Sequence, residues 1–113
     1  MKRLAILLFM LSTSALAQDG VDIHNGFTTG EQFLRMSDPE KRAFSMGTVN
    51  GMLLAPLFGA PKERMLRIES CVEGMTGSQI AAILEKYLRD NPSLWHETPH
   101  TAMYAALVQT CPE

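Results

Sequence analysis

Most of the sequence patterns that identify enzymes are missing from this chain of 113 residues. It has no G-x-S-x-G segment, no glycine-rich phosphate loop and no C-x-x-C pair. These absences argue against a serine hydrolase, a phosphate-loop nucleotide site and a thiol redox centre. Paired carboxylates such as Asp38 and Glu40 stand where a helix is expected to begin, so they suit the helix dipole better than acid–base catalysis. We therefore expect neither catalytic residues nor a cofactor.

Long apolar runs are also scarce, and the longest is the stretch from Leu4 to Leu11. Lys2 and Arg3 precede it, and the small-x-small sequence Ala15–Ala17 follows. This is the layout of a secretory signal peptide, and it predicts cleavage before Gln18. The alternative, a membrane anchor, is disfavoured because the run is too short to cross about 30 Å of hydrocarbon. The sequence thus predicts a signal peptide over residues 1–17, a periplasmic location and no membrane association after cleavage.

Positive charge is limited in the part that would remain. Residues 18–113 form one domain of 96 residues, with its core at about 26–112. Cleavage lowers the Lys and Arg total from 10 to 8 and leaves all 12 acidic residues, so the net charge becomes −4. This balance argues against nucleic acid as a partner, because phosphate binding depends on Lys and Arg. It also gives no reason to propose an anionic membrane surface as partner.

The chain has only two cysteines, Cys71 and Cys111, and both lie after the signal peptide. An even pair in an oxidising compartment predicts a disulfide. Closing that loop would restrict the unfolded chain by about 4 kcal/mol. For so small a domain, this is a large part of the expected net stability.

Hydrophobic periodicity predicts an all-α domain, a small bundle of about four helices with one disulfide. No stretch alternates with period two for long enough to suggest a sheet. Residues 57–74 are expected to form an irregular connection with at most a turn of helix, because Pro61 and a mixed-charge run interrupt it. The helices are expected at 30–36, 38–54, 76–90 and from 98 onward, and capping sequences precede the second and third.

Gly47 and Gly51 are four residues apart in the second predicted helix, and therefore share a face. Each glycine lowers helix propensity. Two of them on one face favour a close approach to another helix over chance. We therefore predict that a large side chain at Gly51 would force two helices apart.

The segment His96–His100 matches the H-E-x-x-H pattern of zinc metalloproteases. That chemistry needs both histidines on one face of a continuous helix. Pro99 has no N–H and disfavours helical angles at Thr98, so the two imidazoles should not lie one turn apart. We interpret the segment as a polar loop leading into the last helix, and we expect no metal ligands.

The connection from Asp90 to Glu97 is the predicted partner-binding surface. It contains the turn-forming pair Asn91-Pro92 and the only tryptophan, and it lies inside the disulfide loop between two helices. A loop whose ends are held loses little entropy on docking. The residues expected to contact a partner are Asp90, Asn91, Trp95, His96 and Glu97. The alternative, that Trp95 merely covers the core, stays open.

Several of these features together resemble the Rap/Tai family of immunity proteins. The resemblance rests on the run Cys71–Gln79, on Tyr87-Leu88 with Asn91-Pro92 and His96, and on a last helix that ends at Cys111-Pro112. It extends upstream to Asn25-Gly26, Phe33-Leu34 and the Gly47–Gly51 helix, and departs at Glu73, where relatives usually have proline or a similar residue. The family consists of small helical periplasmic proteins.

The resemblance implies a function. Members of the Rap/Tai family bind and block peptidoglycan amidases delivered by type VI secretion, so the implied partner is a cognate amidase effector. A periplasmic acid-stress chaperone is the alternative, because such proteins expose apolar surface when carboxylates protonate, and the methionines would suit that role. A homodimer is compatible with the sequence.

Overall fold

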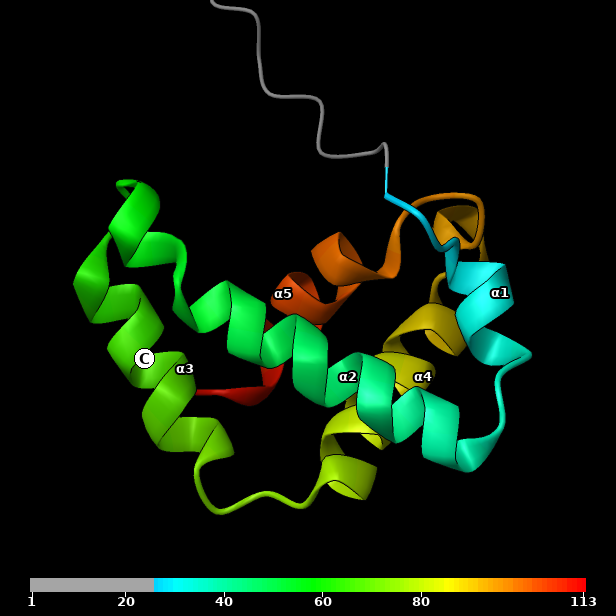
Figure 1. Cartoon of the computed structure of the whole chain (residues 1–113), viewed down its shortest axis with the longest axis horizontal. Helices are drawn as coiled ribbons and strands as arrows, with labels where there is room; N and C mark the ends of the chain where they lie inside the picture. Colours follow the sequence, from blue (N-terminus) through cyan, green and yellow to red (C-terminus); the bar gives the residue numbers. More distant parts are fainter. Residues whose placement is uncertain (1–25) are drawn as a thin grey trace, which may run out of the picture.

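A computed structural model describes residues 26–113 (Figure 1). The predicted signal peptide and its cleavage site before Gln18 lie outside the described residues. The described part is helical and contains no strand, which confirms an all-α bundle. In chain order its elements are α1 (Gly30–Leu34), α2 (Asp38–Leu53), the 3-10 turn η1 (Ala55–Phe58), α3 (Lys62–Val72), α4 (Gly77–Asp90), η2 (Pro92–Leu94) and α5 (Pro99–Thr110).

Capping boxes begin α1, α2 and α4. In each, the side chain of a Ser or Thr at the N-cap accepts a hydrogen bond from the backbone N–H three residues later. The Gln or Glu side chain at that later position accepts a hydrogen bond from the backbone N–H of the N-cap residue in return. In α4, the backbone N–H of Thr76 donates to Gln79 Oε1 at 2.7 Å. In α2, the cap is Ser37, whose side chain accepts from the backbone N–H of Glu40. Local sequence therefore sets where these helices start.

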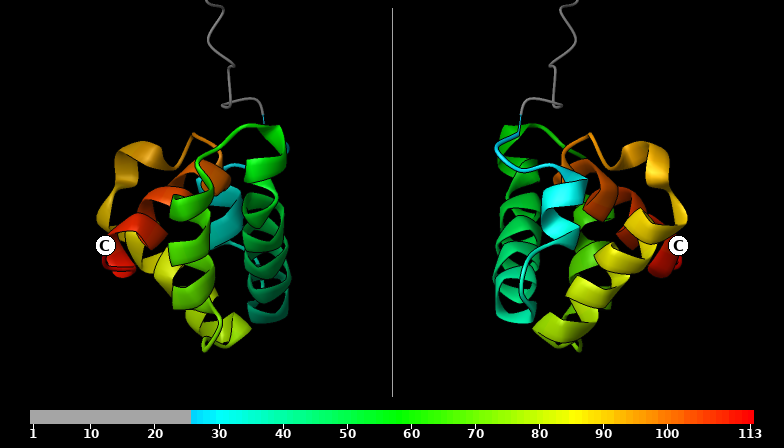
Figure 2. Two further views of the ribbon diagram at one scale, coloured as in Figure 1. Left: turned by 90° about the vertical axis from the view of Figure 1, so that its left-hand side faces the viewer. Right: turned by 90° about the vertical axis from the view of Figure 1, so that its right-hand side faces the viewer.

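The core lies where α2 crosses α4 and α5, and α1 packs against α4 at one end (Figure 1). Figure 2 shows α3 running alongside α2 at the other end. The apolar stripe of α4 faces the core, as its 3.6-residue spacing predicts. The largest fully buried apolar side chains are those of Phe33, Leu84, Leu88, Pro99, Met103 and Leu107.

Helix α3 corrects one prediction, because residues 57–74 were expected to contain at most a turn of helix. The structure has an 11-residue helix there. Met65, Ile68 and Val72 are spaced along one face of it and are buried. Pro61 does not interrupt the helix, since it lies at the N-cap, where its missing N–H costs no hydrogen bond.

The two glycines of α2 correct another prediction. A Cβ built on Gly47 or Gly51 would meet no atom within 4 Å outside the local helix backbone. The buried residues of α2 are Lys41, Ser45 and Val49. Gly47 and Gly51 each follow a buried position by two residues, which is about 200° around the helix. The glycine face is therefore turned away from the core, and the predicted close packing is wrong.

The disulfide between Cys71 and Cys111 is confirmed, with the two Cα atoms 5.6 Å apart. It joins the end of α3 to the residue that follows α5, across 40 positions of sequence. Because α4 lies between these helices in the sequence, the disulfide ties together elements that are not consecutive. It holds α3 against the end of the α4–α5 pair.

Candidate functional site

The connection from Asp90 to Glu97, predicted as the binding surface, is held by its own backbone. Within it, the N–H of Leu94 donates to the carbonyl of Asn91 at 3.0 Å, and that of Glu97 to the carbonyl of Leu94 at 3.0 Å. Two of its carbonyls also accept hydrogen bonds from the first N–H groups of α1. The N–H of Gly30 donates to the carbonyl of Glu97, and the N–H of Glu31 donates to the carbonyl of Trp95, both at 2.8 Å. The loop thus satisfies donors that the start of a helix leaves free.

Most of the predicted contact residues in this region make bonds within the protein. Asp90 forms an ion pair with Lys86 at 2.6 Å. The side-chain amide of Asn91 donates to the carbonyl of Tyr87 at 2.8 Å, while the Trp95 indole N–H donates to the carbonyl of Leu88 at 2.6 Å.

The indole of Trp95 is half-buried against the core, Glu97 is half-buried and His96 is exposed. Trp95 therefore has a structural role. The loop as a partner-binding surface stays a prediction, now resting mainly on His96 and Asp90.

The H-E-x-x-H match does not form the metalloprotease geometry. Thr98 has extended angles of φ −79° and ψ 133°, and α5 begins at Pro99. His96 and Glu97 therefore precede the helix, and only His100 lies on it. Among residues 26–113, no group of three or more His, Cys, Asp or Glu side chains is arranged to hold a metal ion.

An apolar projection between α2 and α3 went unnoticed in the sequence. Leu54, Leu57 and Phe58 are 53%, 78% and 86% exposed, and we call these three side chains the apolar tip. They lie on and just before η1, in green at the upper left of Figure 1. The pair Leu57-Phe58 between Pro56 and Gly59 could have indicated this surface in the sequence, because a turn normally carries polar residues.

The turn that carries the apolar tip is well ordered by hydrogen bonds. The N–H of Leu57 donates to the carbonyl of Leu54 at 2.9 Å, and that of Ala60 to the carbonyl of Ala55 at 3.2 Å. Gly59 closes the turn in the left-handed region, at φ 97°. Because only glycine adopts this conformation easily, the turn depends on it. The tip is therefore a fixed projection on two helices.

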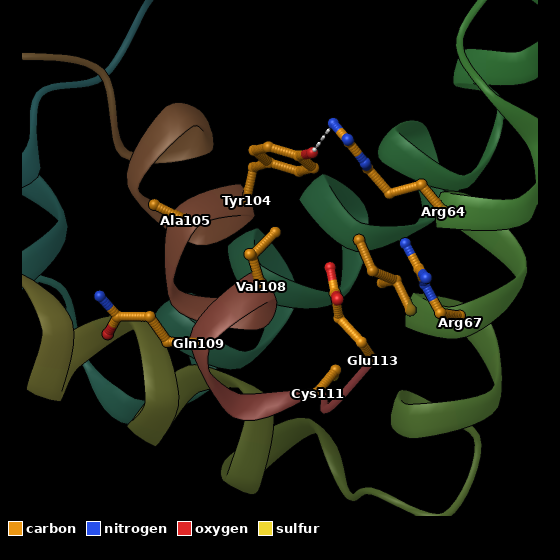
Figure 3. A pocket seen from close by; sticks show the side chains of 9 residues that line it. Arg64, Arg67, Tyr104, Ala105, Val108, Gln109, Cys111 and Glu113 are labelled. Carbon is orange, nitrogen blue, oxygen red and sulfur yellow. Dashed lines mark hydrogen bonds between the residues drawn. The ribbon is translucent and has the colours of Figure 1, made fainter.

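A groove runs between α3 and α5, and we call it the α3–α5 groove. It contains hollows of about 440 and 370 Å³ that share Arg64 and Tyr104 in their walls. Between them, Arg64 Nη1 donates to the Tyr104 hydroxyl at 2.9 Å (Figure 3). The larger hollow lies toward Cys111, and the smaller one reaches Ala55, next to the apolar tip.

One ion pair joins α2 to α4. Lys41 is 8% exposed, and its Nζ lies 3.1 Å from Glu85 Oε1, which also accepts from Arg89 at 2.6 Å. The hydrogen bond from Arg89 lowers the pKa of Glu85, and Lys41 lowers it further, while partial burial opposes both. Lys41 and Glu85 also line a hollow of about 240 Å³ with Asp38 and Ser78. We assign the cluster a structural role, because its ion pair holds two helices together.

No helix in residues 26–113 combines the length and apolar character needed to cross a membrane. Comparison with known proteins gives no further information about function, because no family model, curated protein or solved structure matches the chain significantly.

Proposed function

We propose that this chain is a periplasmic immunity-type protein that binds and inhibits a peptidoglycan amidase toxin. The observation that carries the proposal is the apolar tip, three large exposed side chains on and just before a turn fixed between two helices. The amidase as partner rests on the resemblance to the Rap/Tai family. The choice of the apolar tip as the binding surface is based on the structure.

The apolar tip has the properties of a binding anchor. Leu57 and Phe58 leave most of their surface in water, and burying each would contribute about 1.5–3 kcal/mol. Because the turn is already ordered by its hydrogen bonds and by Gly59, little conformational entropy is lost on docking. Projecting aromatic and aliphatic side chains of this kind dominate the energy of many protein interfaces. A narrow projection also has the shape needed to enter an enzyme cleft.

Inhibition can be measured with purified components. Where a secreted Cys/His amidase is found to be encoded beside the gene for this chain, it is the enzyme to assay for hydrolysis of purified peptidoglycan. We expect residues 18–113 to abolish hydrolysis at an equimolar ratio. Undiminished hydrolysis in molar excess of the chain would contradict the proposal.

The residues responsible are tested in the same assay. Leu57→Ala with Phe58→Ala should weaken inhibition at least tenfold, which corresponds to about 1.4 kcal/mol of lost binding. Met46→Ala is the matched control, because Met46 is half exposed but lies in the middle of α2, outside the tip and outside both hollows of the α3–α5 groove. Equal effects of the tip and control variants would remove the tip as the binding surface.

A second function, the acid-stress chaperone, is favoured by the Lys41–Glu85 pair. Protonation of Glu85 at low pH would leave the buried Lys41 ammonium without its partner and loosen α2 from α4. Separation of these helices would expose core side chains to a client. Light scattering by an aggregating enzyme at about pH 3 distinguishes the two functions, because an amidase inhibitor should not suppress it.

A further inference from the structure

The larger hollow of the α3–α5 groove combines two cations with an apolar wall. Figure 3 shows Arg64 and Arg67 on the α3 side, with Tyr104 and Val108 opposite them on α5. Ile68 contributes a buried apolar side chain between the helices. Arg64 is exposed, and its hydrogen bond to the Tyr104 hydroxyl holds the guanidinium beside α5 at the edge of the groove. A mixed surface of this kind suits a ligand that is both apolar and anionic.

Within residues 26–113, the arginines of the groove have no acidic partner. The ion pairs of the described residues involve Arg35, Lys41, Lys86 and Arg89, and none includes Arg64 or Arg67. Glu113 lines the same hollow, yet it forms no ion pair within 4.0 Å in residues 26–113. Tyr104 accepts from one N–H of Arg64, and the remaining N–H groups can donate to both oxygens of a carboxylate.

Apolar hollows lie on both sides of the Arg64 guanidinium. On the side of the apolar tip, the apolar part of the wall is formed by Met52, Ala55, Pro61 and Met65, while Thr48, His100 and Thr101 add polar groups. We propose that the α3–α5 groove binds an extended peptide segment of a partner protein in which an Asp or Glu lies between two apolar side chains. The carboxylate pairs with Arg64 and Arg67, and one apolar side chain enters each hollow. Alternate residues of an extended chain point to the same side, so these three groups can face the groove together.

The groove continues from the apolar tip, because Ala55 and Ala60 belong to the tip's turn and also line the smaller hollow. One partner could therefore cover both surfaces. The inference rests on the proposed function only in taking a protein as the partner. Binding of a synthetic peptide tests the groove without any amidase, so the two ideas can fail separately.

The probe is the acetylated and amidated peptide Leu-Ala-Glu-Ala-Leu, titrated into residues 18–113 labelled with ¹⁵N. We expect backbone shifts to change around Arg64 and Tyr104, with a Kd of about 1 mM or tighter. The Trp95 indole signal lies outside the groove linings and should stay fixed. Replacing the glutamate of the peptide by glutamine should weaken binding at least tenfold. Absence of shifts in the groove, or equal binding of the two peptides, would overturn the proposal.

Variants of the protein separate a specific site from general charge attraction. Arg64→Glu should weaken peptide binding at least tenfold. Arg35→Glu, an equal change of net charge on α1, should leave it unchanged. Tyr104→Phe should weaken binding less than Arg64→Glu, because it keeps the guanidinium. Equal effects of Arg64→Glu and Arg35→Glu on peptide binding would contradict the proposal. A second contradicting result would be that Arg64→Glu abolishes a self-association of the protein but leaves the peptide bound.

Discussion

Replacing the two glycines of α2 by alanine should stabilise the protein. Gly47 and Gly51 lie inside the helix, and a Cβ on either would meet nothing within 4 Å outside the local helix backbone. The substitution therefore adds no steric cost and removes the conformational penalty of glycine, about 0.8–1.0 kcal/mol per site. Gly51 is near the end of α2, where fraying reduces the gain. We expect about 1.5–2 kcal/mol for the double variant.

Thermal unfolding followed by circular dichroism measures this effect with the disulfide intact. For a domain of this size, 1.5–2 kcal/mol corresponds to a rise in Tm of about 6–16 °C. Gly59→Ala is the contrasting control, because Gly59 has φ 97° and an L side chain is strained there. That variant should lose about 1–2 kcal/mol.

A lower Tm for the double alanine variant would refute the argument. It would mean that the glycine face packs against something, and a concentration-dependent Tm would identify a second copy of the chain as the contact. An unchanged Tm would show that the glycine penalty is offset in this helix. Only a rise supports an exposed face on a monomer.

The remaining predictions concern three other features of the fold. Cys71→Ser should lower the free energy of unfolding by about 2–5 kcal/mol, and thiol titration of the denatured, unreduced wild type should find no reactive group. Glu85→Gln should cost about 1–2 kcal/mol at pH 7, because it leaves the buried Lys41 charge with one bond fewer. Since the folded pKa of Glu85 is lowered, its contribution exists above about pH 4.5 and is lost below it, so urea melts of variant and wild type should converge on acidification. Ser45→Ala should stabilise by about 0.5–1 kcal/mol in the same melts, because the buried Ser45 hydroxyl has no hydrogen-bond partner within residues 26–113.

Local signals account for the parts of the fold that could be predicted. The helical spacing of Ile80, Ile83, Leu84, Tyr87 and Leu88 predicted α4 and its apolar face, and the capping sequence at Thr76 predicted its start. These features depend on residues close in sequence. The Cys71–Cys111 disulfide was predictable because only two cysteines were available to pair.

Features that depend on distant residues were missed. Helix α3 was missed because Pro61 and the mixed-charge run that follows it indicated an irregular connection. The hydrogen bond from Trp95 to the Leu88 carbonyl depends on how the loop folds back over α4. The α3–α5 groove brings Arg64 to Tyr104 across 40 positions of sequence, and no local pattern predicts that contact. Surface sites built in this way become visible only when the helices are placed.

The most direct test of the immunity function is a competition between bacteria. A strain that lacks the gene for this chain is mixed with its parent, whose type VI secretion system would deliver the amidase. We predict that the parent kills the deletion strain, and that a parent without the secretion system does not. The wild-type gene should restore survival, whereas Leu57→Ala with Phe58→Ala should not restore it while remaining folded by circular dichroism. Equal survival of the deletion strain and the parent would contradict the proposed function.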